Sequence, residues 1–332
     1  MPGIATHYIF GRDAYRELAD TLGLGGRGAS CYDGADGRSR NRMRACEEAF
    51  VLGSQGPDPY LFLVAVPAMW PYRTVGSRMH SQDPATLLAN VHETLVVQDG
   101  QVSRNPILRA YGLGFMCHYL LDSAVHPLVY AQQRSICAHG VEGLQGRCVH
   151  GGVHATIETE LDELMLTAKL GVTASEFLPH KHMLRCSSAD LAEISRAMGR
   201  VAQRTLGQNI PAWLFTAVVH VYRCAQTALD SKYSGLRQRF DYLAPLGMAS
   251  PRVLALSHHC EPRYASVFSN DDHIPWPHPH EEGEVMSSSF EELYDRAYER
   301  ALQVVPAFAN PGFGYAECSA LAKGINFLGK HV

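Results

Sequence analysis

Three residues with metal-binding side chains recur at intervals of four along the sequence: His118, Asp122 and His126. Residues four apart on an α-helix differ by only ~40° around its axis, so these side chains would share one face. The pair His154 and Glu158 repeats this spacing further along the chain. Facing helices with inward histidines and carboxylates form metal sites in helical bundles. The spacing therefore predicts a metal site between two helices.

The residues around this run are largely apolar, as shown by Leu113, Phe115, Met116, Leu120 and Leu121. An ionised Asp122 in such surroundings would be costly unless it were paired or bound to a metal. A buried His–Asp hydrogen-bond network is the alternative interpretation. Imidazole and carboxylate ligands without thiolate favour zinc first and other borderline divalent ions second.

Helical spacing of apolar residues extends over most of the chain and predicts an all-α fold. The expected helices cover residues 13–22, 41–52, 106–129, 154–170, 189–206, 211–243 and 289–305. Ser188 is expected to cap one of them, and Ser289 with Glu292 to form a capping box at another. Gly112 and Gly114 indicate close packing of the helix that carries the histidines. The proline-rich segment 273–280 is either a lid or a packed connection.

Composition limits the classes of protein that fit. Hydrophobic residues make up 46% and charged residues 19%, which is enough for a packed core. The formal net charge of -4 and the pI near 6.5 argue against a generally basic nucleic-acid surface. The Gly23–Gly28 stretch matches a dinucleotide fingerprint, but it lacks the preceding strand and following helix.

The N-terminus shows no secretory signal, and the longest apolar run, Leu61–Val66, is far below the ~20 residues that cross a bilayer. The nine cysteines are odd in number and contain no Cys-x-x-Cys, which favours reduced thiols. We therefore expect a soluble cytoplasmic protein without a transmembrane segment. The sequence leaves its oligomeric state open.

The sequence resembles the zinc-dependent phospholipase C family, which shares its all-helical fold with the P1-type nucleases. His118-Tyr119-x-x-Asp122 and His154-x-x-x-Glu158 carry the resemblance. Further matching pieces lie upstream in the family's order: Thr6-His7-Tyr8, Gln55-Gly56-Pro57-Asp58 and Gly76-Ser77-Arg78-Met79-His80. The resemblance covers roughly residues 1–165. It implies a single all-helical domain over residues 1–332, with a metal-site half at about 1–165 and a helical C-terminal half at about 166–332.

The resemblance also implies a site for two to three zinc ions, with the ligands His7, Asp58, His80, His118, Asp122, His126, His154 and Glu158. Asp122 would bridge two ions, one of which is also held by His7. Secreted members complete that ion's ligands with their processed N-terminal amine, whereas six residues precede His7 here. Those members also place the histidine after the bridging aspartate two residues further along than His126.

The function implied is hydrolysis of a phosphate ester, most specifically a phosphodiester, by metal-activated water, with Asp58 accepting the water proton. The expected substrate is a small-molecule or lipid phosphate ester. Nucleic acid is not favoured, because Trp70, Tyr72, Arg73 and Arg78 fit a packed aromatic turn better than a stacking surface. The alternatives are a metal-dependent hydrolase of a non-phosphate substrate and a non-catalytic metal-binding helical protein.

Overall fold

Helices make up most of the structure, a computed structural model that describes residues 3–25, 37–139, 152–229 and 265–332. The α-helices are α1 (Ile4–Leu18), α2 (Gly37–Gly53), α3 (Val75–Ser81), α4 (Pro84–Val91), α5 (Pro106–His139), α6 (Gly152–Met165), α7 (Ala174–Phe177), α8 (Pro179–His182), α9 (Ser188–Leu206), α10 (Leu214–Leu229), α13 (Ala265–Phe268), α14 (Phe290–Phe308) and α15 (Tyr315–Ala322). Two 3-10 helices, η1 (Asp58–Ala65) and η2 (Pro67–Tyr72), and two π-helical turns, η3 (His92–Val96) and η6 (Leu166–Leu170), complete the helical elements of the described residues. The expected all-α class is confirmed.

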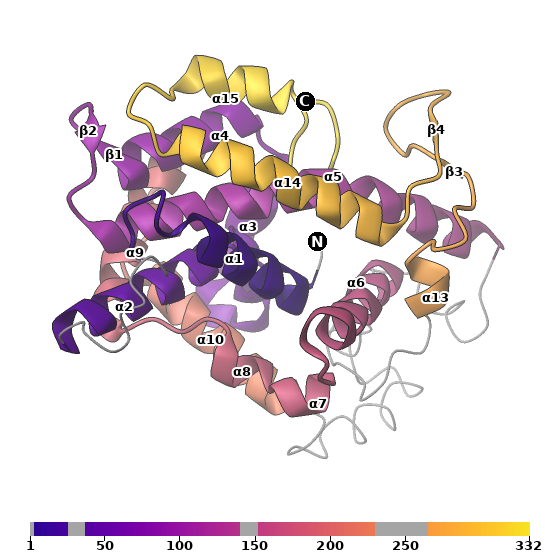
Figure 1. The fold of residues 1–332 in the computed structure, drawn as a ribbon, viewed down its shortest axis with the longest axis horizontal. Coiled ribbons are helices and arrows are strands. Elements are labelled where there is room, and N and C mark those ends of the chain that lie inside the picture. The colour runs from indigo at the N-terminus through magenta and orange to yellow at the C-terminus, as the bar shows by residue number, and fades with distance from the viewer. Residues whose placement is uncertain (1–2, 26–36, 140–151, 230–264) are drawn as a thin grey trace.

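Helix α5 is the central element of the fold (Figure 1). It packs most extensively against α2 and α14, and also contacts α1, α6 and α9. Every residue of α5 from Ala110 to Asp122 is buried, as expected of a helix surrounded by others. A Cβ added at Gly114 would lie 2.0 Å from the Phe50 carbonyl oxygen, so only glycine lets α2 approach this closely. The close packing predicted at this glycine is confirmed.

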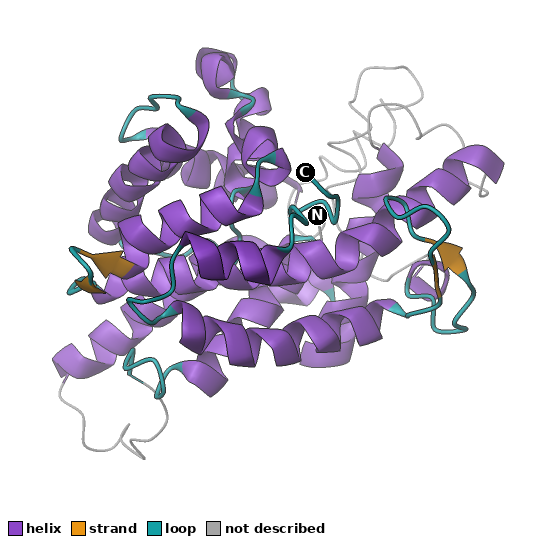
Figure 2. Cartoon of the chain, turned by 90° about the horizontal axis from the view of Figure 1, so that it is seen from above, coloured by secondary structure: helices purple, strands orange, loops and turns teal. Residues whose placement is uncertain are grey.

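Two short antiparallel pairs of strands lie at opposite ends of the molecule (Figure 2). The first joins β1 (Val97–Gln98) to β2 (Gln101–Val102), and the second joins β3 (Trp276–Pro277) to β4 (Val285–Met286). The β3 strand belongs to the proline-rich segment and contacts α5. Arg134 of α5 donates a hydrogen bond of 2.6 Å to the Pro279 carbonyl. Of the two expectations for this segment, the packed connection agrees with these contacts.

Several helix boundaries differ from the sequence expectation. Helix α1 begins at Ile4 instead of at residue 13, and it ends at Leu18 instead of at residue 22. The cap of α9 is Ser187 and not Ser188, because the Ser187 hydroxyl accepts the Asp190 N–H at 3.1 Å. Helix α10 begins at Leu214, and the predicted stretch beyond residue 229 lies outside the described residues. The capping box at Ser289 is present as predicted.

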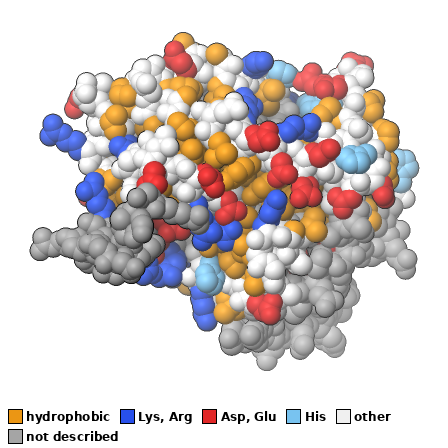
Figure 3. Space-filling model, in the orientation of Figure 1, with side chains coloured by type: hydrophobic (Ala, Val, Ile, Leu, Met, Phe, Trp, Pro, Cys, Tyr) orange, Lys and Arg blue, Asp and Glu red, His pale blue; other side chains and the backbone are white. Residues whose placement is uncertain are grey.

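None of the helices in the described part of the chain is long and apolar enough to span a membrane. On the face shown in Figure 3, acidic and basic side chains are interspersed with apolar ones, with no continuous basic area among the described residues. The described cysteines at 46, 117, 186, 224 and 318 are free. Cys137, however, is disulfide-bonded, so the expectation of reduced thiols is wrong at that position.

Candidate metal centre

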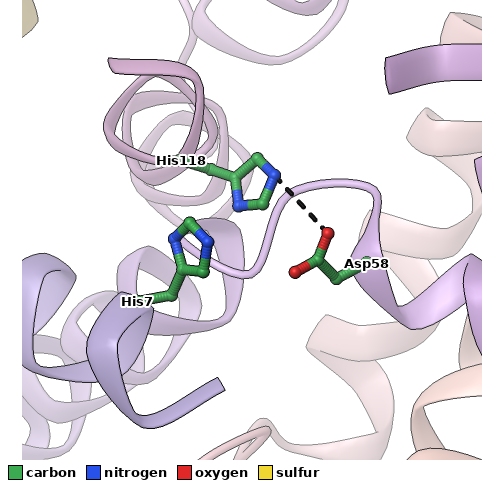
Figure 4. Close-up of side chains that lie close together, drawn as sticks. All are labelled: His7, Asp58 and His118. Atoms are coloured by element: carbon green, nitrogen blue, oxygen red, sulfur yellow. Dashed lines mark ion pairs between the residues drawn. The ribbon is translucent and has the colours of Figure 1, made fainter. Parts of the chain in front are cut away.

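Five of the predicted ligands meet in the interior and form what we call the first cluster: His7, Asp58, His80, His118 and Asp122. They come from α1, the start of η1, α3 and α5, and each is at most 4% exposed. Figure 4 shows three of them, His7, Asp58 and His118, converging from α1, η1 and α5. Segments far apart in the sequence therefore bring imidazoles and carboxylates to one buried point.

The distances in the first cluster are those of ligands around a shared centre. His118 Nε2 lies 3.2 Å from Asp122 Oδ2 and 3.5 Å from Asp58 Oδ1. His80 Nε2 lies 3.0 Å from Asp58 Oδ1 and 3.8 Å from Asp122 Oδ2. On the other side of Asp122, its Oδ1 lies 3.2 Å from His7 Nε2. The two oxygens of Asp122 thus face different histidines, as the predicted bridging role requires.

The remaining predicted ligands, His126, His154 and Glu158, form what we call the second cluster. Glu158 Oε1 lies 2.9 Å from His154 Nε2 and 3.9 Å from His126 Nε2. The other ring nitrogen of His126 lies 3.8 Å from Asp122 Oδ1, so this histidine links the two clusters. The side chains of His154 and Glu158 are 17% and 12% exposed, so the second cluster is nearer to solvent than the first.

Backbone carbonyls determine which ring nitrogen carries the hydrogen in three of the histidines. The Nδ1 atoms of His80, His118 and His126 lie 2.8, 3.2 and 3.1 Å from the carbonyl oxygens of Gly76, Ser54 and Asp122. A carbonyl can only accept, so each Nδ1 carries the hydrogen and each neutral ring has a lone pair on Nε2. These Nε2 atoms face carboxylate oxygens. Two lone pairs repel at such distances unless a proton or a cation lies between them.

Four buried atoms of the clusters have no hydrogen-bond partner among the described residues: His7 Nδ1, His118 Nε2, Asp122 Oδ2 and His126 Nε2. A buried polar atom without a partner is costly, so such atoms point to a bound species. Tetrahedral zinc at ~2.0–2.2 Å from its ligands holds them roughly 3.4 Å apart. The nitrogen–oxygen separations of 2.9–3.9 Å in the two clusters bracket that value. Both clusters can therefore hold a divalent metal ion.

Burial and nearby charge shift the pKa values of the ring nitrogens in opposite directions. Burial lowers the pKa of His7, and it lowers those of His126 and His154 well below the ordinary value. Burial also opposes protonation of His118, but the Asp122 and Asp58 carboxylates outweigh it and raise the pKa of this ring. The same interaction outweighs burial at Asp122, where His118 and His126 hold the carboxyl pKa well below its usual range. An ionised Asp122 and mostly neutral imidazoles are the protonation states that bind metal ions.

The backbone before Asp58 supports the His118 ring. Gly56 has a φ of +51°, and a Cβ there would lie 2.2 Å from His118 Cδ2. Glycine is needed both for this left-handed conformation and for the close approach of the ring. The Ser54 hydroxyl donates to the His7 carbonyl at 2.9 Å, while its own carbonyl accepts from His118. One short segment thus orients ligands from two helices.

Two aromatic side chains complete the site, and the sequence did not single them out. Phe327, near the C-terminus, lies 5.7 Å from the His80 ring and 5.8 Å from the His118 ring, measured between centroids. Tyr130 lies 4.9 Å from the His154 ring. Tyr130 continues the interval of four after His126, so the spacing could have revealed it. Phe327 carries no such signal, since its place depends on the folding of the C-terminal segment.

Comparisons with known proteins give no assignment. No family model matches the chain, and no curated protein or solved structure matches it either. The function is therefore inferred from the residues of the two clusters.

Proposed function

We propose that the protein is a metal-dependent hydrolase of phosphate esters of the phospholipase C and P1 nuclease type, which uses two to three zinc ions. One observation carries this proposal. Five imidazoles and three carboxylates meet in two linked clusters, and ring nitrogens that lack a proton face carboxylate oxygens there. The absence of cysteine from both clusters favours zinc bound by nitrogen and oxygen, as in hydrolytic zinc sites.

The residues of the first cluster would divide the work of binding and proton transfer. When bound, divalent ions offset charge on a phosphoryl group and lower the pKa of a bound water toward ~7. Asp122 presents one oxygen to His118 and the other to His7, so it could contribute a ligand to each of two ions. Asp58, 4% exposed and 3.0 Å from His80, is the carboxylate we propose as the acceptor of the water proton.

A small-molecule or lipid phosphodiester fits better than a nucleic acid. The interspersed charges of the described residues on the face in Figure 3 offer no basic track for a long polyanion. Trp70 is 50% exposed, but its Nε1 donates to the Val64 carbonyl, and Arg73 donates to the Trp70 carbonyl. These polar groups therefore form hydrogen bonds within the turn itself. We place the substrate on the side of the second cluster, because exposure increases from Asp122 toward His154.

A non-catalytic metal-binding role is the second candidate, and the burial of the first cluster favours it. His7, His118 and Asp122 are all 0% exposed. Ligands this deeply buried are common around metal ions that only stabilise a fold. The two candidates agree on metal binding and differ on turnover.

The test measures zinc and turnover on the same protein. Purified protein is analysed for zinc, stripped with a chelator, and reloaded. Turnover is followed on chromogenic phosphate diesters and monoesters, with a carboxylic ester and an amide as controls. The proposal expects bound zinc and diester hydrolysis that disappears on stripping and returns on reloading. Zinc without turnover on any substrate supports the second candidate. Full diester turnover by zinc-free protein overturns both.

A further inference from the structure

The buried carboxylate of Asp162 binds the first turn of α1 from a different helix. Its Oδ2 accepts the Ala5 N–H at 2.9 Å, and its Oδ1 accepts the Thr6 N–H at 2.8 Å and the Thr6 hydroxyl at 2.7 Å. Asp162 lies on α6 and is 1% exposed. The first N–H groups of a helix have no partner within the helix, and a negative charge there is favoured by the helix dipole. Asp162 therefore caps α1 from across the fold.

Helix α1 has no cap of its own. Its N-cap residue is Gly3, which offers no side chain, and its first turn holds no acidic residue. Helix α4 shows the local alternative, since Asp83 accepts the N–H groups of the two residues Ala85 and Thr86 that follow it closely. A Cβ at Gly3 would lie 2.2 Å from Asp162 Oδ2. Glycine at the N-cap thus leaves room for a carboxylate supplied by α6.

The two helices joined by this cap each carry a candidate ligand. On α6, Asp162 continues the interval of four from His154 and Glu158, so ligands and cap share one stripe. On α1, His7 directly follows Thr6, and its own N–H bonds to the Gly3 carbonyl at 3.2 Å. A shift of this first turn moves His7 relative to Asp122, which lies 3.2 Å away. The face of α6 that carries His154, Glu158 and Asp162 therefore positions His7 of the first cluster as well as the ligands of the second cluster on α6.

We propose that Asp162 is a positioning residue that holds His7 in the first cluster, and that its loss releases the ion bound by His7 and Asp122. This inference rests on the proposed metal binding. Asp162 acts on His7 through the backbone of Ala5 and Thr6. This positioning role explains why the carboxylate of Asp162, which takes no part in the proposed hydrolysis, is buried.

The first test measures the anchor in metal-free protein. Amide hydrogen exchange at Ala5 and Thr6 is compared among wild type, Asp162→Asn and Ser187→Ala. Asparagine keeps the size of the side chain but removes the charge and one acceptor. We expect exchange at these amides to rise about tenfold or more in Asp162→Asn, as for loss of a charge-assisted hydrogen bond. Ser187→Ala removes the cap of α9, which carries no candidate ligand, and should leave these amides unchanged. Unchanged exchange in Asp162→Asn overturns the anchor.

The second test counts zinc in the full chain. We expect Asp162→Asn and His7→Ala each to lose about one zinc ion per chain, while Ser187→Ala should keep the wild-type number. Gly3→Ala is the second variant, because its Cβ displaces the carboxylate without removing a charge, and it should show the same loss. Full zinc content in folded Asp162→Asn overturns the positioning role alone. A wild-type protein that binds no zinc overturns this role and the proposed function together.

Discussion

His118 and Asp122 lie one turn apart on α5, and the Nε2 of the histidine is 3.2 Å from Oδ2 of the aspartate. The other ring nitrogen of His118 faces the Ser54 carbonyl, which leaves Nε2 without a hydrogen in the neutral ring. A proton and a metal ion therefore compete for the same space between these two atoms. In the metal-free protein, the Asp122 carboxylate favours a proton on His118 and so raises the pKa of this ring. The same carboxylate would attract a metal ion.

The first prediction concerns Asp122→Asn, which keeps the shape of the bridging side chain and removes its charge. An amide is a weaker ligand than a carboxylate and leaves His7 and His118 without a shared anionic partner. Because outer-shell changes alone lower metal affinity or activity by ~10–100-fold, we expect a loss on the order of a hundredfold or more. Zinc content and diester turnover should fall together, measured by elemental analysis and initial rates.

Asp271→Asn is the matched control for this prediction, because Asp271 is exposed and belongs to neither cluster. It should keep both zinc and turnover. Wild-type zinc content in Asp122→Asn would show that Asp122 does not bridge metal ions.

The second prediction is that the two clusters lose their ions separately. His154→Ala removes a ligand whose ring lies in the second cluster, 2.9 Å from Glu158. We expect it to lose one ion and to leave the first cluster loaded, whereas His80→Ala should do the reverse. Native mass spectrometry of each variant counts the ions that remain. If His154→Ala loses all of its zinc, the link through His126 makes the clusters a single cooperative site.

The local part of the site could be predicted from the sequence. The intervals of four among His118, Asp122 and His126 place these side chains on one face wherever this segment is helical. The structure agrees: all three lie on α5 and are buried. The predicted ligands outside α5 and α6, such as Asp58, also lie in the clusters. They were predicted from the family resemblance and not from residue spacing.

What could not be predicted depends on contacts between distant segments. The early start of α1 is stabilised by Asp162, which is 156 residues from Thr6, and no pattern within the first residues reveals it. Phe327 is likewise placed beside His118 by tertiary packing alone. The cap of α9 at Ser187 instead of Ser188 is a different failure. Adjacent serines are equally good caps in sequence, and the backbone geometry chooses between them.

The third prediction uses Gly56, which combines a positive φ with a close contact to His118. Gly56→Ala should lower the free energy of unfolding and also lower zinc content, because its Cβ would lie 2.2 Å from His118 Cδ2. Gly100→Ala is the matched control: its φ is +72°, and nothing lies within 4 Å of an added Cβ. The control should cost only the backbone strain of about 1 kcal/mol and keep its zinc. Equal effects of the two variants in denaturant unfolding would show that the His118 contact is unimportant.

The fourth prediction is that the stability of metal-free protein passes through a maximum near pH 6.5. The pKa values of His7, His126 and His154 are lowered in the fold, so below pH 6.5 the unfolded chain binds protons that the fold excludes. Stability then falls as pH falls, by up to roughly 1.4 kcal/mol per pH unit for each group. The pKa of His118 is raised, so its contribution is fully present below pH 6.5 and is lost as pH rises through the folded value.

Burial also lowers the pKa values of His92 and His280. Because five described histidines act on the acid side and one on the alkaline side, the decline should be steeper toward low pH. Near pH 4 the lowered pKa of Asp122 adds to it, since the unfolded carboxyl takes up a proton before the folded one does. Denaturant midpoints of chelator-treated protein between pH 4 and 8 measure this profile. His118→Gln should remove the decline on the alkaline side and keep the one on the acid side. A metal-free profile that is flat from pH 5 to 7 contradicts the prediction, because it would mean that these histidines titrate alike in the folded and unfolded chains.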